Sequence, residues 1–230
     1  MRATVTHIEK VTASIYTYWL QPERRVRFDA GQFIEIYIPH NPVDNRGDWR
    51  EFSLSSSPSE AELSITTNFF ENGSSYKKAL QGLVPGADVT FKEPMGDFVL
   101  PKDLTIPLVF VAAGLGTMPY ISMVKWLKER GEQRPIQLIH SVSRASDFLF
   151  NDVWQGYNLE FMPIVTRPDN SWAGAVGRLD APRLLEFIGP IENKLVYLAG
   201  PQSLIEPMFN NLLAAGIPRS QLLLDYYPGY

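Results

Sequence analysis

Arg50-Glu51-Phe52-Ser53 is a short segment that places three kinds of ligand-binding side chain next to one another. In an extended chain, residues two apart point the same way and neighbours point to opposite faces. A guanidinium holds a phosphate through a rigid fork of donors, an aromatic ring lies flat on a heterocycle, and a hydroxyl bonds a ring nitrogen. These three ligand features together describe a flavin nucleotide. The alternative interpretation is an ordinary strand with one exposed arginine.

A second candidate site is the turn Ala112-Ala113-Gly114-Leu115-Gly116-Thr117-Met118-Pro119, which joins a predicted strand to a predicted helix. Glycines let the backbone approach a phosphate, and a helix N-terminus offers free N–H groups with a partial positive charge. Gly200-Pro201 repeats this arrangement after another predicted strand. Ligands of parallel sheets bind at the carboxyl ends of the strands. Two such turns favour a nucleotide site, although each alone is equally a tight turn that needs small residues.

The segment Asp225-Tyr226-Tyr227-Pro228-Gly229-Tyr230 gathers aromatic rings around one carboxylate. As structure alone, it is a sheet edge with packing tyrosines. As function, it supplies an aromatic lid and a group that handles a proton.

The first hundred residues are typical of short strands separated by turn residues, which favours a small antiparallel barrel or sandwich. The expected strands are rich in β-branched and aromatic residues and cover Val11–Leu20, Gln32–Ile38, Glu51–Ser55, Leu63–Phe69 and Asp88–Lys92.

After Pro101-Lys102-Asp103 the pattern changes to alternating strands and helices, which predicts a parallel sheet. The expected strands are Leu108–Ala113, Ile136–His140, Leu159–Val165, Lys194–Leu198 and Leu222–Tyr226, with helices opening at Pro119 and spanning Pro201–Ala215. A boundary near residue 103 follows, with domains at 1–103 and 104–230.

Composition excludes several classes of function. The formal charge of −4 gives no general case for nucleic-acid or membrane binding. With no cysteine and only three scattered histidines, thiolate metal sites and iron–sulfur clusters are excluded and no metal site is expected. No apolar run reaches the roughly 18 residues of a membrane helix, and no secretory signal is recognised. A cytoplasmic location is therefore the default expectation.

Six motifs together resemble the ferredoxin–NADP reductase superfamily, without a fused iron–sulfur domain. The flavin-domain motifs are Arg50–Ser53, Gly73–Leu80 and Glu93–Phe98, and the pyridine-nucleotide motifs are Ala112–Pro119, Gly200-Pro201 and Asp225–Tyr230. They follow the family's order and cover almost the whole chain. The resemblance implies an N-terminal antiparallel Greek-key β-barrel that binds FAD and a C-terminal parallel-sheet α/β domain that binds NADPH or NADH.

The resemblance also implies roles for the flavin-domain residues. Arg50 would bind the FAD pyrophosphate, Phe52 would pack on the flavin, and Ser53 would lie beside the flavin N5. Asp225 would reach toward Ser53 as the second catalytic residue. The remaining expected FAD-binding residues are Thr67, Ser74, Ser75 and Tyr227, and the two serines are equally an N-cap of the following helix.

In the second domain the resemblance assigns NAD(P) binding to the two glycine turns. The expected residues are Gly114, Gly116, Thr117, Pro119, Gly200 and Pro201, with Arg144 and Arg167 for the adenosine end. An arginine there can pair with the 2′-phosphate of NADP, which favours NADPH, while solvated loop arginines are the alternative. Met118 and Ala199 replace the family's usual threonine and cysteine near the nicotinamide.

The expected function is hydride transfer from NAD(P)H to FAD, with electrons passing to a separate acceptor such as a ferredoxin or flavodoxin. Glu23–Arg27 and Lys77-Lys78 are candidate basic patches for an acidic carrier, or solvated surface. The alternative function is an FAD-binding electron-transfer or regulatory subunit with little NAD(P)H activity of its own. No nucleic-acid partner and no membrane span are expected.

Overall fold

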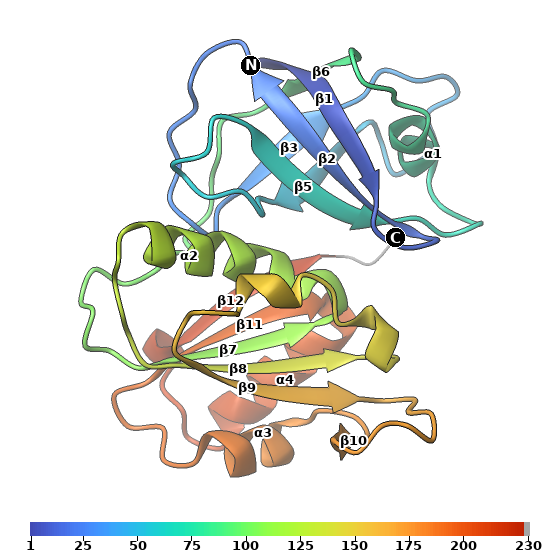
Figure 1. The fold of residues 1–230 in the computed structure, drawn as a ribbon. Coiled ribbons are helices and arrows are strands. Elements are labelled where there is room, and N and C mark those ends of the chain that lie inside the picture. Colours follow the sequence, from blue (N-terminus) through green and yellow to red (C-terminus); the bar gives the residue numbers. More distant parts are fainter. Residues whose placement is uncertain (228–230) are drawn as a thin grey trace. The chain divides into compact units, whose positions relative to one another are not determined.

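The computed structural model describes residues 1–227 and divides by contacts into two compact units. Of the described residues, the first unit comprises Met1–Leu100 together with Met118–Trp126, and the second comprises Pro101–Thr117 and residues 127–227. Each unit holds one six-stranded sheet, and the two sheets are coloured blue to green and green to red in Figure 1. The domain boundary near residue 103 stays a prediction.

The first unit is an antiparallel sheet with the strand order β4-β3-β6-β1-β2-β5 and one short helix (Figure 1). Its elements are β1 (Arg2–Lys10), β2 (Ile15–Pro22), β3 (Phe33–Tyr37), β4 (Trp49–Ser53), β5 (Leu63–Asn68), α1 (Ser75–Gln81) and β6 (Asp88–Phe91). The sequence predicts five of these strands, and the structure places their ends at different residues; the sequence does not predict β1.

The predicted barrel is barrel-like but not closed by a continuous ladder. Its edge strands β4 and β5 meet through the isolated bridge between Leu54 and Ile65, supported by the Ser55 N–H donating to the carbonyl oxygen of Ser64 at 2.9 Å. The residues that fill the interior are apolar and include Val5, Leu20 and Ile36, each no more than 1% exposed. Burial of these side chains supplies the main driving force for the unit.

The second unit is a parallel sheet with the order β10-β9-β8-β7-β11-β12. Its strands are β7 (Leu108–Ala113), β8 (Ile136–Val142), β9 (Leu159–Val165), β10 (Ala175–Val176), β11 (Leu195–Pro201) and β12 (Leu222–Tyr227). In chain order, β8, β9 and β10 follow one another on one side of β7, and β11 and β12 lie on its other side. The order therefore reverses between β7 and β11, which is the switch point where open α/β sheets bind ligands.

The chain after residue 113 also forms helices, and most of the first, Met118–Trp126, clusters by contacts with the first unit. The helices are α2 (Met118–Glu129), α3 (Ala181–Ile188) and α4 (Gln202–Ala214), with single turns η1 (Gly114–Thr117), η2 (Ala145–Asp147), η3 (Asn151–Val153) and η4 (Arg219–Gln221). Asp180 caps α3, its side chain accepting from the Arg183 N–H at 3.0 Å. Leu184 of α3 and Ile205 of α4 belong to one buried cluster with residues of the sheet such as Val111.

Two further properties bear on function. Within residues 1–227, no helix has both the length and the apolar character needed to cross a membrane. The same part of the chain brings together no group of three His, Cys, Asp or Glu side chains suited to a metal ion.

Candidate functional site

Arg50 and Phe52 of β4 share one face and meet the helix α1. The Arg50 guanidinium carbon lies 5.1 Å from the centre of the Tyr76 ring, and the Phe52 ring stacks on the same tyrosine at 6.2 Å. The Arg50 Nη1 donates to the carbonyl oxygen of Arg46 at 2.7 Å, which holds the arginine beside its own loop. Phe52 is 7% exposed and Tyr76 is fully buried. The predicted pairing of a guanidinium with a flat ring is therefore present on one face of β4.

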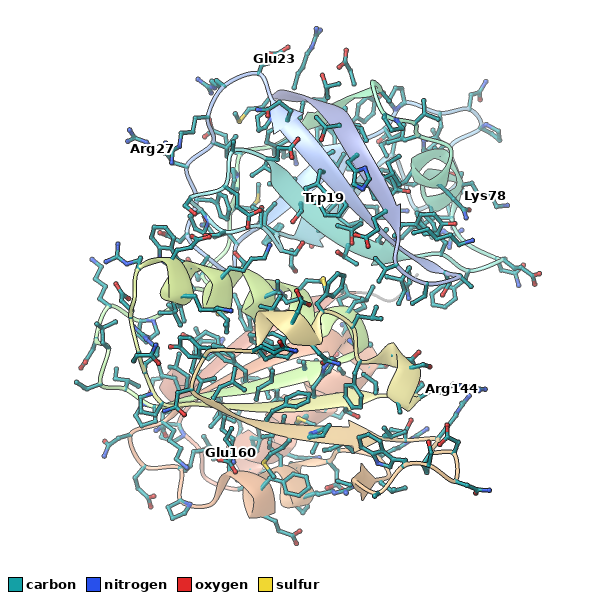
Figure 2. All side chains as sticks on the ribbon, in the orientation of Figure 1. Trp19, Glu23, Arg27, Lys78, Arg144 and Glu160 are labelled. Carbon is teal, nitrogen blue, oxygen red and sulfur yellow. The ribbon has the colours of Figure 1, made fainter. Side chains whose placement is uncertain are left out.

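Lys77 completes this cluster and was not predicted as a site residue. Its Nζ lies 5.4 Å from the centre of the Phe52 ring and 5.7 Å from that of Phe69, and it donates to the Thr67 hydroxyl. Burial, and secondarily the Arg50 charge, lower the pKa of Lys77 to about 8. Thr67, an expected FAD-binding residue, is thus in the same cluster as Phe52. The Lys77 amine does not contribute to a basic surface patch, because it donates to the hydroxyl of the buried Thr67. Lys78 is exposed (Figure 2).

Ser74 and Ser75 are engaged by the protein itself. The Ser74 hydroxyl accepts from the Lys77 N–H at 3.2 Å as the N-cap of α1, and this serine is fully buried. The Ser75 hydroxyl accepts from the Asp44 N–H at 2.9 Å and pairs with the His40 Nε2 at 2.9 Å. The capping interpretation is therefore confirmed for Ser74, and the phosphate-binding role of both serines stays a prediction.

Ser53 ends β4 and pairs in the ladder with Phe33, one residue beyond the buried Phe52. Strand alternation turns its side chain away from the Arg50 and Phe52 face. Ser53 is partly exposed, as its predicted role beside a bound ring requires. Asp225 belongs to the second unit, so its approach to Ser53 stays a prediction.

In the second unit, the two glycine turns do come together at the switch point. A Cβ on Gly116 would lie 2.1 Å from the carbonyl oxygen of Ala199, and one on Gly200 would lie 2.8 Å from the Ala113 Cβ. Gly200 also has φ +155°, which side-chain-bearing residues rarely adopt. The turn after β7 and the end of β11 are in direct backbone contact, and only glycine fits at either point.

Two buried polar groups adjoin this turn. Thr117, an expected NAD(P)-binding residue, is 1% exposed, and its hydroxyl has no hydrogen-bond partner within residues 1–227. His140 on β8 is also 1% exposed, and its Nε2 lies 3.0 Å from the carbonyl oxygen of Gly114. Since a carbonyl oxygen accepts, Nε2 carries the proton, and burial lowers the His140 pKa to about 4. A neutral histidine therefore holds the Gly114 end of the turn, a contact that sequence reasoning missed.

Arg144 and Arg167 follow the neighbouring strands β8 and β9. Their loops are joined by the Arg167 N–H, which donates to the carbonyl oxygen of Ser143 at 2.9 Å. Both side chains are exposed, and Figure 2 shows Arg144 extending away from the end of its strand. The structure thus places two arginines at one edge of the sheet, as the parallel pairing predicts.

Asp225 and Tyr227 lie at the end of β12. They pair in register with Ala199 and Pro201 of β11, which puts them beside the second glycine turn. Asp225 is partly exposed, and burial followed by the Asp225 charge raises the pKa of Tyr227. Pro228, Gly229 and Tyr230, the rest of the predicted aromatic cluster, lie outside the described residues.

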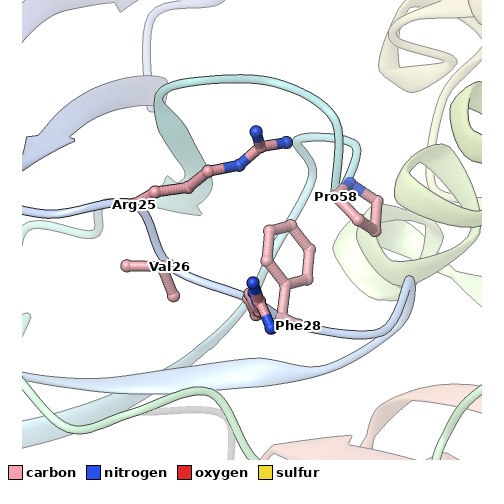
Figure 3. A pocket seen from close by; sticks show the side chains of 5 residues that line it. Arg25, Val26, Phe28 and Pro58 are labelled. Atoms are coloured by element: carbon pink, nitrogen blue, oxygen red, sulfur yellow. The ribbon is translucent and has the colours of Figure 1, made fainter.

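A cavity of about 450 Å³ in the first unit is separate from all of these side chains. It is lined by Arg25, Val26, Arg27, Phe28 and Pro58 (Figure 3). None of the expected cofactor-binding residues contributes to it. Part of the predicted Glu23–Arg27 basic patch therefore borders a hollow, while Arg24 is paired with Glu93 at 3.2 Å.

Comparison with known proteins agrees with this arrangement. Residues 110–208 match the family model of the oxidoreductase NAD-binding domain. The structure is similar to a ferredoxin NADP+ reductase from Neisseria gonorrhoeae with bound FAD and NADP, with a TM-score of 0.81, 21% identity and 98% of each chain covered. The chain thus shares the two-domain fold of this reductase, and the predicted resemblance to the ferredoxin–NADP reductase superfamily is confirmed as a likeness in fold.

Curated relatives are oxidoreductases and reductase components. An NADPH oxidoreductase from Mycobacterium tuberculosis is 28% identical over 89% of this chain and 54% of its own length. The reductase component of propane 2-monooxygenase from Rhodococcus jostii is 24% identical over 99% of this chain and 63% of its own length. The chain therefore spans between half and two thirds of the length of these relatives.

Proposed function

We propose that the chain is an NAD(P)H-dependent flavoprotein reductase, with FAD held by the first unit and NAD(P)H by the second. The observation that supports this most directly is the meeting of two glycine turns at the switch point of the parallel sheet, between β7 and β11. Backbone N–H groups freed by such turns bind phosphate. The match of residues 110–208 to an oxidoreductase NAD-binding domain supports the same ligand class.

The first unit has the side chains that FAD requires. The guanidinium of Arg50 suits the pyrophosphate, because it forms paired hydrogen bonds to phosphate oxygens. Phe52, whose ring stacks on the fully buried Tyr76, is the aromatic side chain that we assign to the flat ring system. Thr67 adds a hydroxyl to the same cluster, and Ser74 and Ser75 order the helix and loop beside it. We assign FAD binding to this cluster.

The second unit has the groups that a nicotinamide nucleotide requires. Gly114, where an added Cβ would meet nothing within 4 Å, leaves room for the close approach of a phosphate or ribose to the backbone, whereas Gly116 and Gly200 let the two turns pack against each other. The Thr117 hydroxyl, which has no hydrogen-bond partner among the described residues, is available to that ligand. Pro119 and Pro201 stiffen the two turns where the following helices begin. His140 orients the Gly114 carbonyl group without carrying charge, because its pKa is about 4.

When bound, the two cofactors supply hydride transfer and the later release of electrons. The chain supplies orientation and control of the proton. We assign Ser53 a hydrogen bond at the flavin N5, and we assign Asp225 the movement of a proton between that position and solvent. Tyr227, kept neutral by its raised pKa, would cover the ring without adding charge.

The acceptor is proposed to be separate from this chain. Relatives that include a monooxygenase reductase component favour an oxygenase or a small electron carrier as the recipient. Arg25 and Arg27, exposed beside the cavity of the first unit, are the basic groups that would meet an acidic carrier.

Anaerobic titration of the purified protein tests the proposed activity. We expect a bound FAD spectrum that bleaches in proportion to added NADPH. The variant Arg50→Ala tests the assigned FAD site: it should lose FAD while its circular dichroism spectrum stays that of the folded protein. A flavin-free protein, or a bound flavin that neither NADPH nor NADH bleaches, would contradict the proposal.

Preference for NADPH is proposed from Arg144 and Arg167. Both arginines follow adjacent strands and are exposed to a ligand. Their replacement by alanine should raise the KM for NADPH about 10-fold or more and leave that for NADH unchanged, since a charge-assisted hydrogen bond contributes about 1.5–3 kcal/mol. Arg130, exposed and paired with Glu132, is the control position. A wild type that prefers NADH would refute this assignment.

A further inference from the structure

The ammonium group of Lys77 is enclosed in a way that is unusual for a lysine. Its Nζ lies near two aromatic rings, 5.4 Å from the centre of Phe52 and 5.7 Å from the centre of Phe69. Its hydrogen-bond acceptor is the neutral Thr67 hydroxyl, and Thr67 is 4% exposed. Within residues 1–227, Lys77 forms no ion pair with a carboxylate. A cation held among rings without a counter-charge is costly, because burial removes water from the charge.

A second cation lies in the same cluster. The Arg50 guanidinium rests on the Tyr76 ring, and Tyr76 in turn stacks on Phe52. The Arg50 charge is close enough to lower the pKa of Lys77, in addition to the larger effect of burial. Two like charges that converge from β4 and α1 repel each other. Such convergence is typical of a place where an anion binds.

Among residues 1–227, the other titratable groups around Lys77 do not supply that anion. Tyr16 and Tyr18 of β2 contact the Phe69 ring, and burial raises the pKa of Tyr18, so it is neutral. His40 packs edge-on against Tyr76. Asp44 is engaged by Arg46 at 2.8 Å and by the Ser75 N–H at 2.8 Å.

We propose that Lys77 is the second cation of the FAD pyrophosphate site, acting with Arg50 so that two positive charges meet the two negative charges of the diphosphate. This inference rests on the proposed FAD binding and adds to it a residue that the motif assignments left out. The ammonium donates to phosphate oxygens as a point charge, while the guanidinium binds them through its fork.

A consequence is that FAD binding takes up protons. Without FAD, the pKa of Lys77 is about 8, so above that pH much of the amine is neutral. A bound diphosphate favours the charged form and raises this pKa. At pH 8.5, binding should therefore take up to about one proton per FAD, and no uptake from Lys77 should occur well below pH 8.

The test compares the apoprotein of the wild type with Lys77→Met, Lys77→Arg and Lys78→Met, using FAD and ADP as ligands. Calorimetry in two buffers of different ionisation enthalpy gives the affinity and the proton count together. We expect Lys77→Met to weaken FAD and ADP binding by the same factor, about 10- to 100-fold, and to abolish proton uptake. Lys77→Arg should restore affinity without the uptake, and Lys78→Met, at an exposed neighbour, should behave as wild type.

Three results separate the possibilities. Wild-type apoprotein that does not bind FAD refutes the proposed function itself. Lys77→Met that binds FAD as tightly as wild type leaves the proposed function intact and overturns the role of Lys77. Weaker FAD binding with unchanged ADP binding and a shifted flavin spectrum would place the lysine at the ring, which also overturns this inference.

Discussion

Replacement of Lys77 by methionine should stabilise the apoprotein at neutral pH. Methionine keeps an unbranched apolar side chain near the Phe52 and Phe69 rings and removes the enclosed charge. The pKa of Lys77 falls from the ordinary 10.5 to about 8, first through burial and then through Arg50. At about 1.36 kcal/mol per pKa unit, this corresponds to about 3 kcal/mol against folding while the amine is charged. Residual exposure of the side chain reduces the expected difference to about 1–2 kcal/mol.

The change of this stability difference with pH follows from the number of protons that the folded and unfolded chains bind. Between about pH 8 and 10.5 the unfolded chain holds the Lys77 proton and the folded chain does not, so the free energy of unfolding of the wild type rises with pH. The destabilisation is present in full below pH 8 and is absent above 10.5. The advantage of Lys77→Met should therefore be largest near pH 7 and shrink through this window.

Urea unfolding of the apoproteins from pH 7 to pH 10 measures this difference. Lys78→Met is the control, because it removes the exposed amine of the neighbouring residue and leaves Lys77 in place. Tyrosines that titrate in the same range are common to all variants and cancel. The reasoning would be refuted if the difference in free energy of unfolding between wild type and Lys77→Met stayed constant from pH 7 to pH 10.

Three other predictions follow from the two units. Gly116→Ala should lower the free energy of unfolding in urea by about 2 kcal/mol or more and weaken NADPH binding, because its Cβ would meet the Ala199 carbonyl oxygen at 2.1 Å. The control Gly82→Ala should change the free energy of unfolding little. Ser53→Ala should slow anaerobic flavin reduction while FAD stays bound; an unchanged stopped-flow rate would exclude its role at N5. His140→Phe should remove part of the fall in stability between pH 6.5 and about 4, since the folded state keeps this histidine neutral while the unfolded chain binds its proton; identical acid unfolding of the variant would contradict this.

The sequence predicted best what depends on neighbours in the chain. The range Leu108–Ala113 agrees with β7 residue for residue, because a continuous apolar run between Pro107 and Gly114 leaves little choice. The glycine turns after β7 and β11 could also be placed, since their small residues are local signals.

The missed strand β1 depends on distant partners. It pairs with β2 and with β6, and its register shifts between Val5 and His7, so its alternation of buried and exposed residues is interrupted. Its sequence alone therefore lacked the regular pattern of a strand. Lys77 was missed for a related reason. A lysine on a short helix is ordinarily solvated, and only the packing of α1 against the residues around Phe52 and Phe69 encloses its amine.

The single bridge between Leu54 and Ile65 has a consequence for local opening of the fold. Within the described part of the chain, β4, which carries Arg50, Phe52 and Ser53, forms a ladder only with β3 and is an edge strand of its sheet. Amides of an edge strand exchange with deuterium more readily than those of a central strand such as β1. β4 should thus be among the first strands of the first unit to exchange, and a ligand that bridges it to α1 would slow this exchange. Deuterium uptake at residues 49–53 therefore gives a measure of ligand binding that needs neither colour nor turnover.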